Sequence, residues 1–319
     1  MNRMKAIRIH RHGGPEVLEY EEAPRPEPGE GEVLVRVRAA GVNPVDWKIR
    51  EGYLQSALRH SLPLIPGWDL SGTVERVGPG AGRFARGDAV YARPDVARDG
   101  AYAEYTVVRA SELARKPRSL GPVEAAAVPL AALTAWQALF EAPAPFTSAG
   151  LERGQTVLVH GAAGGVGTFA VQLAKWRGAR VIATGSGGNE GFLRELGADD
   201  FIDYRRRRFE DSVRGVDVVL DTVGGETQER SWSVLAPGGV LVSIVSPPSP
   251  EDALAHGVRT GFVFTQSLAA QLDQIAELVD AGAVRPVIAD VLPLARARMA
   301  QELSRTGHVR GKIVLDVAG

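Results

Sequence analysis

The sequence predicts a mixed α/β chain with two domains, a mainly β domain and a domain built on a parallel sheet. Short strands interrupted by Gly and Pro occupy roughly the first 125 residues. From Gln155 onward, short apolar runs alternate with helical stretches at a spacing typical of βαβ units. A glycine-rich turn joins one of these runs to a helix. The length of 319 residues fits two domains of roughly 150 residues each.

The composition excludes several classes of protein. The chain has no Cys, so it forms no disulfide framework, thiolate zinc site, iron–sulfur cluster or cysteine nucleophile. Its 37 Lys and Arg residues balance 38 Asp and Glu residues, which gives no general attraction to nucleic acid or anionic membranes. No apolar run approaches about 18 residues, and the N-terminus lacks the apolar region of a signal peptide. We therefore expect a soluble, cytoplasmic protein that binds neither nucleic acid nor membranes.

The first domain is expected to be a β structure. Residues 33–38 alternate Val with Leu or Arg, which is the period of a strand with two different faces. Residues 72–77, 88–91 and 101–108 predict further strands, separated by turns rich in Gly and Pro.

The second domain is expected to begin with a helix from Glu124 to Phe140, even though Pro129 lies near its start. A loop rich in Pro follows this helix. Strands are then expected at 156–160, 180–184, 200–203, 217–220 and 240–245, with 262–265 as a candidate sixth strand. Their order along the chain, with helices between them, predicts a doubly wound parallel sheet. Four acidic residues that flank these strands are expected to cap or solvate them: Asp199, Asp200, Asp217 and Asp221.

The last part of the chain is expected to return to the first domain. Apolar residues at helical spacing predict a one-faced helix over 268–281, which ends before Gly282. The tail at 311–317 is strand-like and is expected to rejoin the first half. The predicted domains are therefore 1–125, 126–265 and a C-terminal return at 266–319.

The strongest functional signal is the turn that contains Gly161, Gly164, Gly165, Val166 and Gly167. Glycines allow a tight turn, close approach of the backbone to a pyrophosphate, and close packing of helix on strand. The helix N-terminus then offers free N–H groups and a positive dipole to the phosphates. An ordinary αβ turn is the alternative. The strand before the turn, the helix after it and the next strand together predict dinucleotide binding.

The loop after the next strand favours NADPH over NADH. NAD-dependent enzymes usually carry Asp or Glu here, about 20 residues beyond the glycines. This loop has no acid, and Ser186 and Asn189 can donate hydrogen bonds to a 2′-phosphate. It also has no Arg or Lys, which limits the expected preference to about one to two orders of magnitude.

Two interpretations remain for the residues after the following strand. The run Arg205–Arg208 could reach the 2′-phosphate, or it could be a solvated basic loop. Tyr204 could stack on the adenine, or it could simply cap the strand.

Five further motifs, together with the glycine turn, resemble the medium-chain dehydrogenase/reductase superfamily, in its zinc-free quinone oxidoreductase (zeta-crystallin-like) branch. The resemblance covers nearly the whole chain. It implies a GroES-like β catalytic domain, an inserted Rossmann domain that binds NADPH, a C-terminal return to the first domain, and a homodimer. The motifs are Met4-Lys-Ala-Ile, Gly41-Val-Asn-Pro-Val-Asp46, Pro66-Gly-Trp-Asp-Leu-Ser-Gly72, Gly87-Asp-Ala-Val90 and Gly307-His-Val-Arg-Gly-Lys312.

The sequence departs from the zinc-dependent relatives at their metal sites. Asn43 stands where they carry a cysteine ligand, and Trp68 and Asp69 stand in their Gly-His-Glu segment. The four-cysteine lobe for structural zinc is impossible without Cys, and the six His residues show no metal-site spacing. Without a Lewis acid to stabilise an alkoxide, reduction of a quinone or activated alkene is favoured over alcohol oxidation.

The resemblance implies three catalytic residues. Asn43 would contact the nicotinamide ribose or carboxamide, Asp46 would support that loop, and Tyr53 would face the substrate. Asp46 could instead be a turn or cap acid without a role at the cofactor. Tyr53 could instead be a partly buried surface aromatic, although a phenol can donate a proton to a developing enolate oxygen.

The resemblance also implies five cofactor contacts besides the glycine turn. Thr134 would hold the nicotinamide end, or could be a helix residue whose hydroxyl bonds back to a carbonyl. Val223 would lie beside the adenine-side ribose. Ser246, Phe264 and Lys312 would be later contacts.

The expected function is zinc-independent, NADPH-dependent reduction of a small-molecule quinone. A 2-alkenal or enone reductase is the enzymatic alternative, because the chemistry is almost shared. An NADPH-binding sensor or interaction module without catalytic activity is the third possibility, because a fold does not fix a function.

Overall fold

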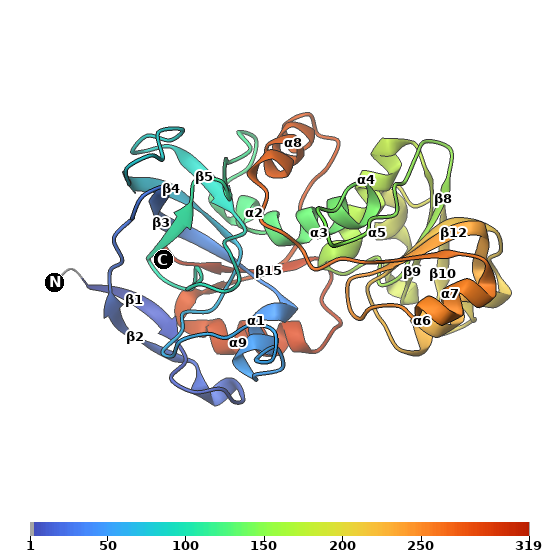
Figure 1. The fold of residues 1–319 in the computed structure, drawn as a ribbon, viewed down its shortest axis with the longest axis horizontal. Helices are drawn as coiled ribbons and strands as arrows, with labels where there is room; N and C mark the ends of the chain where they lie inside the picture. The colour runs from blue at the N-terminus through green and yellow to red at the C-terminus, as the bar shows by residue number, and fades with distance from the viewer. Residues whose placement is uncertain (1–2, 319) are drawn as a thin grey trace. The chain divides into compact units, whose positions relative to one another are not determined.

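The structure is a computed structural model that describes residues 3–318. The chain divides into two compact units (Figure 1). The first unit comprises Met1–Leu130, Ser267–Gly282 and Pro286–Gly319, and the second comprises Ala131–Gln266 and Ala283–Arg285. The units are described separately below. No helix of the described residues is long and apolar enough to cross a membrane.

The first unit is built on a seven-stranded sheet with the order β14-β15-β3-β4-β5-β7, in which β6 also pairs with β3. Most neighbours are antiparallel, and only β14 and β15 run parallel. The strands are β3 (Glu32–Val42), β4 (Leu70–Val77), β5 (Ala89–Ala92), β6 (Tyr105–Arg109), β7 (Leu113–Arg115), β14 (Ile288–Pro293) and β15 (Lys312–Asp316).

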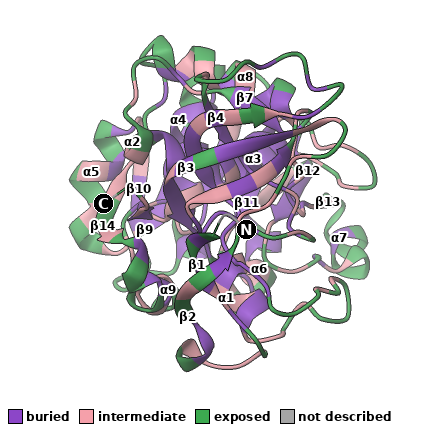
Figure 2. Cartoon of the chain, turned by 90° about the vertical axis from the view of Figure 1, so that its left-hand side faces the viewer, coloured by how far each residue is buried: buried purple, intermediate pink, exposed green. Residues whose placement is uncertain are grey.

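A separate antiparallel pair of strands and several helices complete the described part of the first unit. Along β3, buried residues (purple) predominate over exposed ones (green) (Figure 2). Ala126 and Ala127 pack with Ala39 and Val314 in one buried cluster, because small side chains let the helix lie close to the sheet. The remaining elements are β1 (Arg3–Arg8), β2 (Glu19–Pro24), α1 (Pro44–Arg50), α2 (Pro122–Ala126), α8 (Ala269–Asp280) and α9 (Ala297–Arg305).

The second unit is a parallel six-stranded sheet with the order β10-β9-β8-β11-β12-β13. In chain order this is 3-2-1-4-5-6, the doubly wound arrangement whose direction reverses between β8 and β11. The strands are β8 (Thr156–Val159), β9 (Arg180–Gly185), β10 (Asp200–Asp203), β11 (Val216–Asp221), β12 (Leu235–Ser243) and β13 (Arg259–Phe262). The helices are α3 (Pro129–Leu139, from Ala131 onward), α4 (Gly165–Arg177), α5 (Glu190–Glu195), α6 (Glu226–Ser231) and α7 (Pro250–His256).

The structure confirms the predicted mixed α/β fold but corrects the helix expected at 124–140. Two helices, α2 and α3, occupy this stretch, and the helical conformation is interrupted between them at Ala127 and Val128. Pro129 causes the break, because proline has no N–H to donate and disfavours helical geometry at the residue before it.

Three further segments differ from the sequence-based expectation. The candidate sixth strand lies at Arg259–Phe262, three residues earlier than 262–265, and β6 covers only the second half of the strand expected at 101–108. The strand β14 was not predicted. Asp290 and Val291 are consecutive and both exposed, so this strand lacks the alternation of buried and exposed residues from which a strand is predicted. The two compact units do not test the predicted domain limits at 125 and 265, which stay predictions.

Candidate functional site

Asn43 lies at the junction between β3 and α1 in the first unit. The strand ends at Val42, and Pro44 starts the helix because its fixed φ suits a first helical position. Asp46 then accepts the backbone N–H of Asn43 at 2.8 Å, as the third helical residue does in a capping box. The Asn-Pro-x-Asp sequence therefore fixes the backbone that carries the Asn43 side chain.

The Asn43 side chain is held by two buried charged groups. Its Nδ2 donates to Asp69 Oδ2 at 2.9 Å, and its Oδ1 accepts a hydrogen bond from Lys312 Nζ. Lys312 Nζ also donates to Val42 O at 3.0 Å and to Asp69 Oδ2 at 3.2 Å. A lysine ammonium has three N–H groups, and here each has a protein acceptor. The second amide N–H of Asn43 is left for another partner.

Asp69 connects this network to the start of α3. Its Oδ1 accepts the Leu130 N–H at 2.6 Å, at the helix end where a carboxylate is favoured by the dipole. Burial raises the pKa of Asp69, and the neighbouring Lys312 ammonium acts in the opposite direction. Gly41 is required beside it, because a Cβ there would lie 2.8 Å from Asp69 Oδ2 and 2.5 Å from Ala126 O.

Asp46 is a fully buried carboxyl group rather than a surface cap. Burial raises the pKa of Asp46 to about 7, although the Tyr102 hydroxyl and the Asn43 N–H both donate to it. Both bonds reach Oδ2, and Oδ1 has no hydrogen-bond partner among the residues that the structure describes. Asp46 thus caps α1 and positions the backbone of Asn43, and a role of Asp46 at the cofactor stays a prediction.

Tyr53 lies outside this buried network. It follows α1, is 63% exposed, and presents its ring to Trp47 with the ring centres 6.1 Å apart at 84°. Its contact with the substrate stays a prediction. The predicted contact of Lys312 with the cofactor also stays a prediction, and the structure gives its ammonium a second role in holding Asn43.

The side chains in the segments where zinc-dependent relatives carry their ligands contact other groups of the protein. Trp68 is buried and donates its indole N–H to Arg98 O at 3.0 Å, and Asp69 pairs with Lys312. Among the described residues, one group could hold a metal ion by its geometry: His10, Glu19 and Glu21. This group lies on the β1–β2 hairpin and does not include the Asn43 loop.

The glycine turn of the second unit joins β8 to α4. Gly161 has φ +62°, and Gly164 is the N-cap of the helix. Gly167 packs so closely that a Cβ would lie 2.4 Å from Gly161 O. The first N–H groups of a helix have no acceptor within it, so the start of α4 offers donors to an anion. These residues fit the pyrophosphate of a dinucleotide at the carboxyl end of β8, beside the point where the strand order reverses.

The loop after β9 places Ser186 and Asn189 together. Asn189 Nδ2 donates to Ser186 Oγ at 3.0 Å, and the Asn189 N–H donates to Ser186 O at 2.8 Å. Asp203, at the end of β10, is a neighbour that the sequence did not reveal. A Cβ at Gly187 would lie 2.6 Å from its Oδ2, so an acid does lie beside this loop.

The arginines after β10 point to different partners. Arg206 Nε lies 3.6 Å from Asp203 Oδ2, and the Arg205 guanidinium lies 5.8 Å from the centre of the exposed Tyr204 ring. Arg208 pairs with Glu210, and Arg207 lines a hollow with residues that start β8, β9 and β10. Arg205 and Arg206 therefore remain candidates for contacting a phosphate near Ser186.

Asp221 organises the ends of β11 and β12. Its Oδ1 accepts the Val223 and Gly224 N–H groups at 2.9 and 2.8 Å, and its Oδ2 accepts Gln228 Nε2 at 3.0 Å. Gln228 Nε2 also donates to Ser246 O at 3.1 Å. The predicted cofactor residues Val223 and Ser246 are thus held by one buried carboxylate, which acts as the expected capping acid.

Thr134 and Phe264 lie on two neighbouring segments of the second unit. The hydroxyl oxygens of Thr134 and Thr265 are 2.6 Å apart. Gln137 exchanges two hydrogen bonds with the backbone of Gln266, both at 2.9 Å. The segment after β13 is therefore fixed against α3, and the Thr134 hydroxyl takes part in this contact through Thr265.

The comparisons with known proteins agree with this architecture. The alcohol dehydrogenase GroES-like domain family matches residues 29–118, and the zinc-binding dehydrogenase family matches residues 196–315. A chloroplast envelope quinone oxidoreductase homolog of Arabidopsis thaliana is 34% identical, with 98% of each chain covered. A 2-methylene-furan-3-one reductase of Solanum lycopersicum is 36% identical over 98% of this chain and 79% of the relative.

Two solved structures have the same fold over almost their whole length. The quinone oxidoreductase from Coxiella burnetii has a TM-score of 0.90 and 34% identity, and the match covers 99% of this chain and 100% of the other. A mycobacterial protein complexed with NADPH has a TM-score of 0.85 and 32% identity, with 98% and 100% covered.

Proposed function

This chain belongs to the medium-chain dehydrogenase/reductase superfamily, in its quinone oxidoreductase-like branch, and we propose that it is an NADPH-dependent reductase of quinones. The observation that carries the proposal is the Gly161–Gly167 turn at the carboxyl end of β8. Bound there, a reduced nicotinamide cofactor would supply a hydride. The protein's own residues would orient the cofactor and supply a proton.

The cofactor site is proposed to use the carboxyl edge of the six-stranded sheet. The start of α4 would bind the pyrophosphate, and the Val223–Gly224 turn and Ser246 would contact the cofactor beyond it. Thr134 and Phe264 would contact the nicotinamide end. In the first unit, the remaining amide N–H of Asn43 would bind the cofactor, with the side chain held in place by Lys312 and Asp69.

NADPH is proposed over NADH, because Ser186 and Asn189 can both donate to a 2′-phosphate. We expect kcat/KM to be higher with NADPH by about one to two orders of magnitude. Ser186→Asp should remove most of this preference, because a carboxylate repels the phosphate. Asp203→Asn should increase it, because the carboxylate beside Gly187 is removed. Equal kcat/KM for both cofactors in the unmodified protein would show that this loop does not recognise the phosphate.

Quinones are the proposed substrates because two of the proteins that this chain resembles are named for quinone oxidoreduction. The Solanum lycopersicum relative favours an enone reductase as the second candidate. A panel of quinones, 2-alkenals and enones with NADPH as donor separates them by kcat/KM. Tight NADPH binding without turnover of any member would instead support the sensor or interaction module.

Zinc independence is proposed from the residues at the former ligand positions. The Lys312 ammonium already donates to Asn43 and Asp69, so a second cation there would be repelled. Activity should be unchanged after exhaustive chelation. One zinc per chain in elemental analysis, together with activity lost on its removal, would contradict this proposal.

The homodimer is proposed from the family resemblance, and the cytoplasmic location from the composition of the sequence. Sedimentation at several protein concentrations tests the first, and localisation of the tagged chain tests the second.

A further inference from the structure

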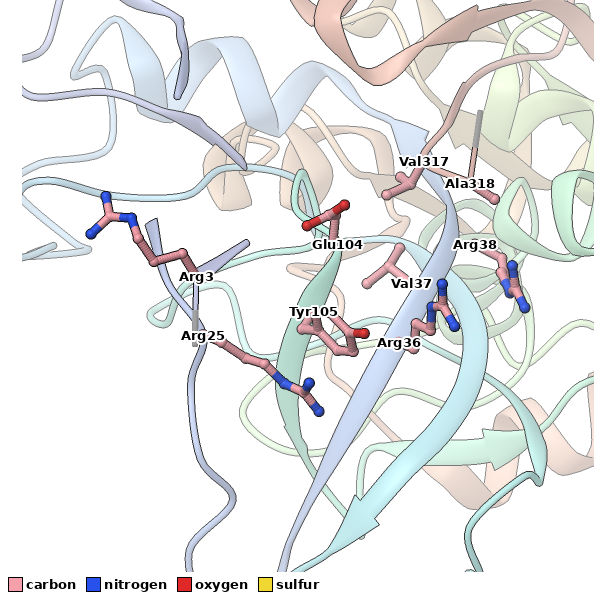
Figure 3. Close-up of a pocket in the computed structure, with 9 residues that line it drawn as sticks. All are labelled: Arg3, Arg25, Arg36, Val37, Arg38, Glu104, Tyr105, Val317 and Ala318. Atoms are coloured by element: carbon pink, nitrogen blue, oxygen red, sulfur yellow. The ribbon is translucent and has the colours of Figure 1, made fainter. Parts of the chain in front are cut away.

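The first unit carries an arginine-lined hollow that shares no residue with the sites described above. Its volume is about 330 Å³. Figure 3 shows the residues that line it. Arg36, Arg38, Arg25 and Arg3 line it, together with Glu104 and Tyr105. Such a concentration of guanidinium groups around one concave surface points to an anionic ligand.

The fold fixes two of these arginines on one strand face. Arg36 and Arg38 are two residues apart on β3, so their side chains leave the same side of the sheet. Arg36 lies directly opposite Tyr105 in the β3–β6 register. The N–H groups of Val317 and Ala318 both donate to Arg38 O, at 3.0 and 3.3 Å, which fixes the chain that forms the rim.

The four arginines differ in whether their charge is already balanced. Arg3 Nε donates to Glu22 at 2.9 Å, and its side chain points away from the others in Figure 3. Arg25 pairs with Glu75 at 3.1 Å and stacks on the Tyr105 ring, 4.0 Å from its centre.

The guanidinium groups of Arg36 and Arg38 form no hydrogen bond or ion pair with any residue between 3 and 318. Two like charges on one strand face repel each other, so a bound anion would relieve an interaction that the protein alone leaves unfavourable. Arg25, although paired with Glu75, keeps a buried Nε that has no hydrogen-bond partner among residues 3–318.

Glu104 indicates that the ligand is more than a bare anion. One of its carboxylate oxygens accepts the Lys5 N–H at 2.8 Å, and the carboxylate lines the same hollow. A carboxylate beside a phosphate is repulsive unless a donor lies between them. A hydroxyl group on the ligand would be such a donor.

We propose that this hollow binds a small phosphate monoester that carries hydroxyl groups. Arg36 and Arg38 would bind the phosphate through the planar N–H pairs that match its oxygens. Arg25 and Tyr105 would form the wall, and Glu104 would accept a hydroxyl of the ligand. The site is separate from the glycine turn and does not depend on the proposed reductase activity.

Calorimetric titration of the full chain tests this proposal. Inorganic phosphate and glycerol 3-phosphate are titrated at low ionic strength into protein already saturated with NADPH, so that the cofactor's own phosphate sites are filled. We expect saturable binding of both, with glycerol 3-phosphate the tighter. R36Q/R38Q should weaken both by about tenfold or more, the loss expected for one or two charge-assisted bonds.

Two matched variants make the result specific. R11Q/R296Q removes the same charge from two exposed arginines of the first unit outside the hollow, so its affinities should match the unmodified chain. E104Q should tighten inorganic phosphate and remove the advantage of glycerol 3-phosphate. The absence of saturable binding, or an equal loss in R36Q/R38Q and R11Q/R296Q, would overturn the proposal.

Discussion

Buried Lys312 and Asp69 stabilise each other, and neither would be tolerated alone. Both are nearly or fully inaccessible, and their charged atoms lie 3.2 Å apart. Desolvation of such a pair offsets much of its attraction, so the pair adds little stability beyond what two apolar residues would give. The role of this ion pair is to fix the side chain of Asn43, which forms hydrogen bonds with both Asp69 and Lys312.

Lys312→Met should therefore lower the free energy of unfolding by about 3–5 kcal/mol, because it leaves the Asp69 carboxylate buried without a cation. Urea denaturation measures this loss. The double variant D69N/K312M should be more stable than K312M alone, since no uncompensated charge remains. A K312M chain as stable as the unmodified protein would show that Asp69 is neutral in the fold.

His160 makes stability depend on pH in the second unit. Its Nδ1 lies 3.2 Å from Thr184 Oγ1, and its Nε2 lies 3.0 Å from Ser231 Oγ. Ser231 donates its hydroxyl proton to Thr227 O, so Ser231 Oγ accepts the Nε2–H and Nδ1 accepts from Thr184. Burial lowers the pKa of His160 from 6.5 to about 4. The folded state therefore holds the neutral ring.

Unfolded chains bind a proton at this residue below about pH 6.5, whereas folded chains do so only below about pH 4. The stabilising contribution is thus complete above pH 6.5 and is lost as the pH falls toward 4. Comparing His160→Gln with the unmodified chain by urea denaturation across this range should show a difference that changes by about 3 kcal/mol. A difference independent of pH would mean that His160 titrates normally in the fold.

At the scale of elements, the glycine turn depends on the close packing of α4 against the chain that enters it. Gly167→Ala places a methyl group 2.4 Å from a backbone oxygen, and neither backbone segment can yield as a flexible side chain would. We expect a loss of about 1–3 kcal/mol in stability and weaker dinucleotide binding, measured by thermal unfolding and fluorescence titration.

Gly191→Ala is the matched control for this substitution. Gly191 lies in α5 of the same unit, and a Cβ there meets nothing within 4 Å. Alanine should stabilise this helix by up to about 1 kcal/mol and leave cofactor affinity unchanged. Equal behaviour of the two variants would show that the turn tolerates a side chain.

Elements with a local signal could be predicted from the sequence. The strand–glycine–helix unit is visible because a turn, an apolar run and a helical stripe follow one another within about thirty residues. The break at Pro129 was missed because the Ala- and Leu-rich residues on both sides favour helix, whereas the proline acts on only a few positions.

The parts of the site that could not be predicted come from distant positions. Lys312 reaches Asn43 across 269 residues, and Asp69 reaches Leu130 across 61. Asp203 was missed for the same reason, since it lies on the strand beside the loop rather than within it. A single sequence shows which side chains are able to form hydrogen bonds or ion pairs. The pairing between strands determines which of these side chains lie in contact.

At the scale of the whole molecule, the first unit needs both ends of the chain. Tyr91 donates its hydroxyl to Leu272 O at 2.5 Å, and β15 pairs with β3 from Ile313↔Val42 to Asp316↔Ala39. A chain truncated after Gly311 should therefore lose cooperative unfolding of the first unit, because β14 loses its partner strand and Asn43 loses Lys312. Hydrogen exchange of the β3 amides measures this loss. Undiminished protection there would show that β15 is dispensable.

The return of β15 to the middle of the sheet also sets the order in which the parts of the fold can form during translation. Residues 33–42 are translated early, yet the strand that pairs with residues 39–42 is translated about 270 residues later. The second unit, which contains the parallel sheet, is nearly contiguous in the chain. It can therefore fold before the C-terminal strand of the first unit has been translated. Throughout that interval the nascent N-terminal part exposes an unpaired strand edge, which is the feature that chaperones protect and that aggregation exploits.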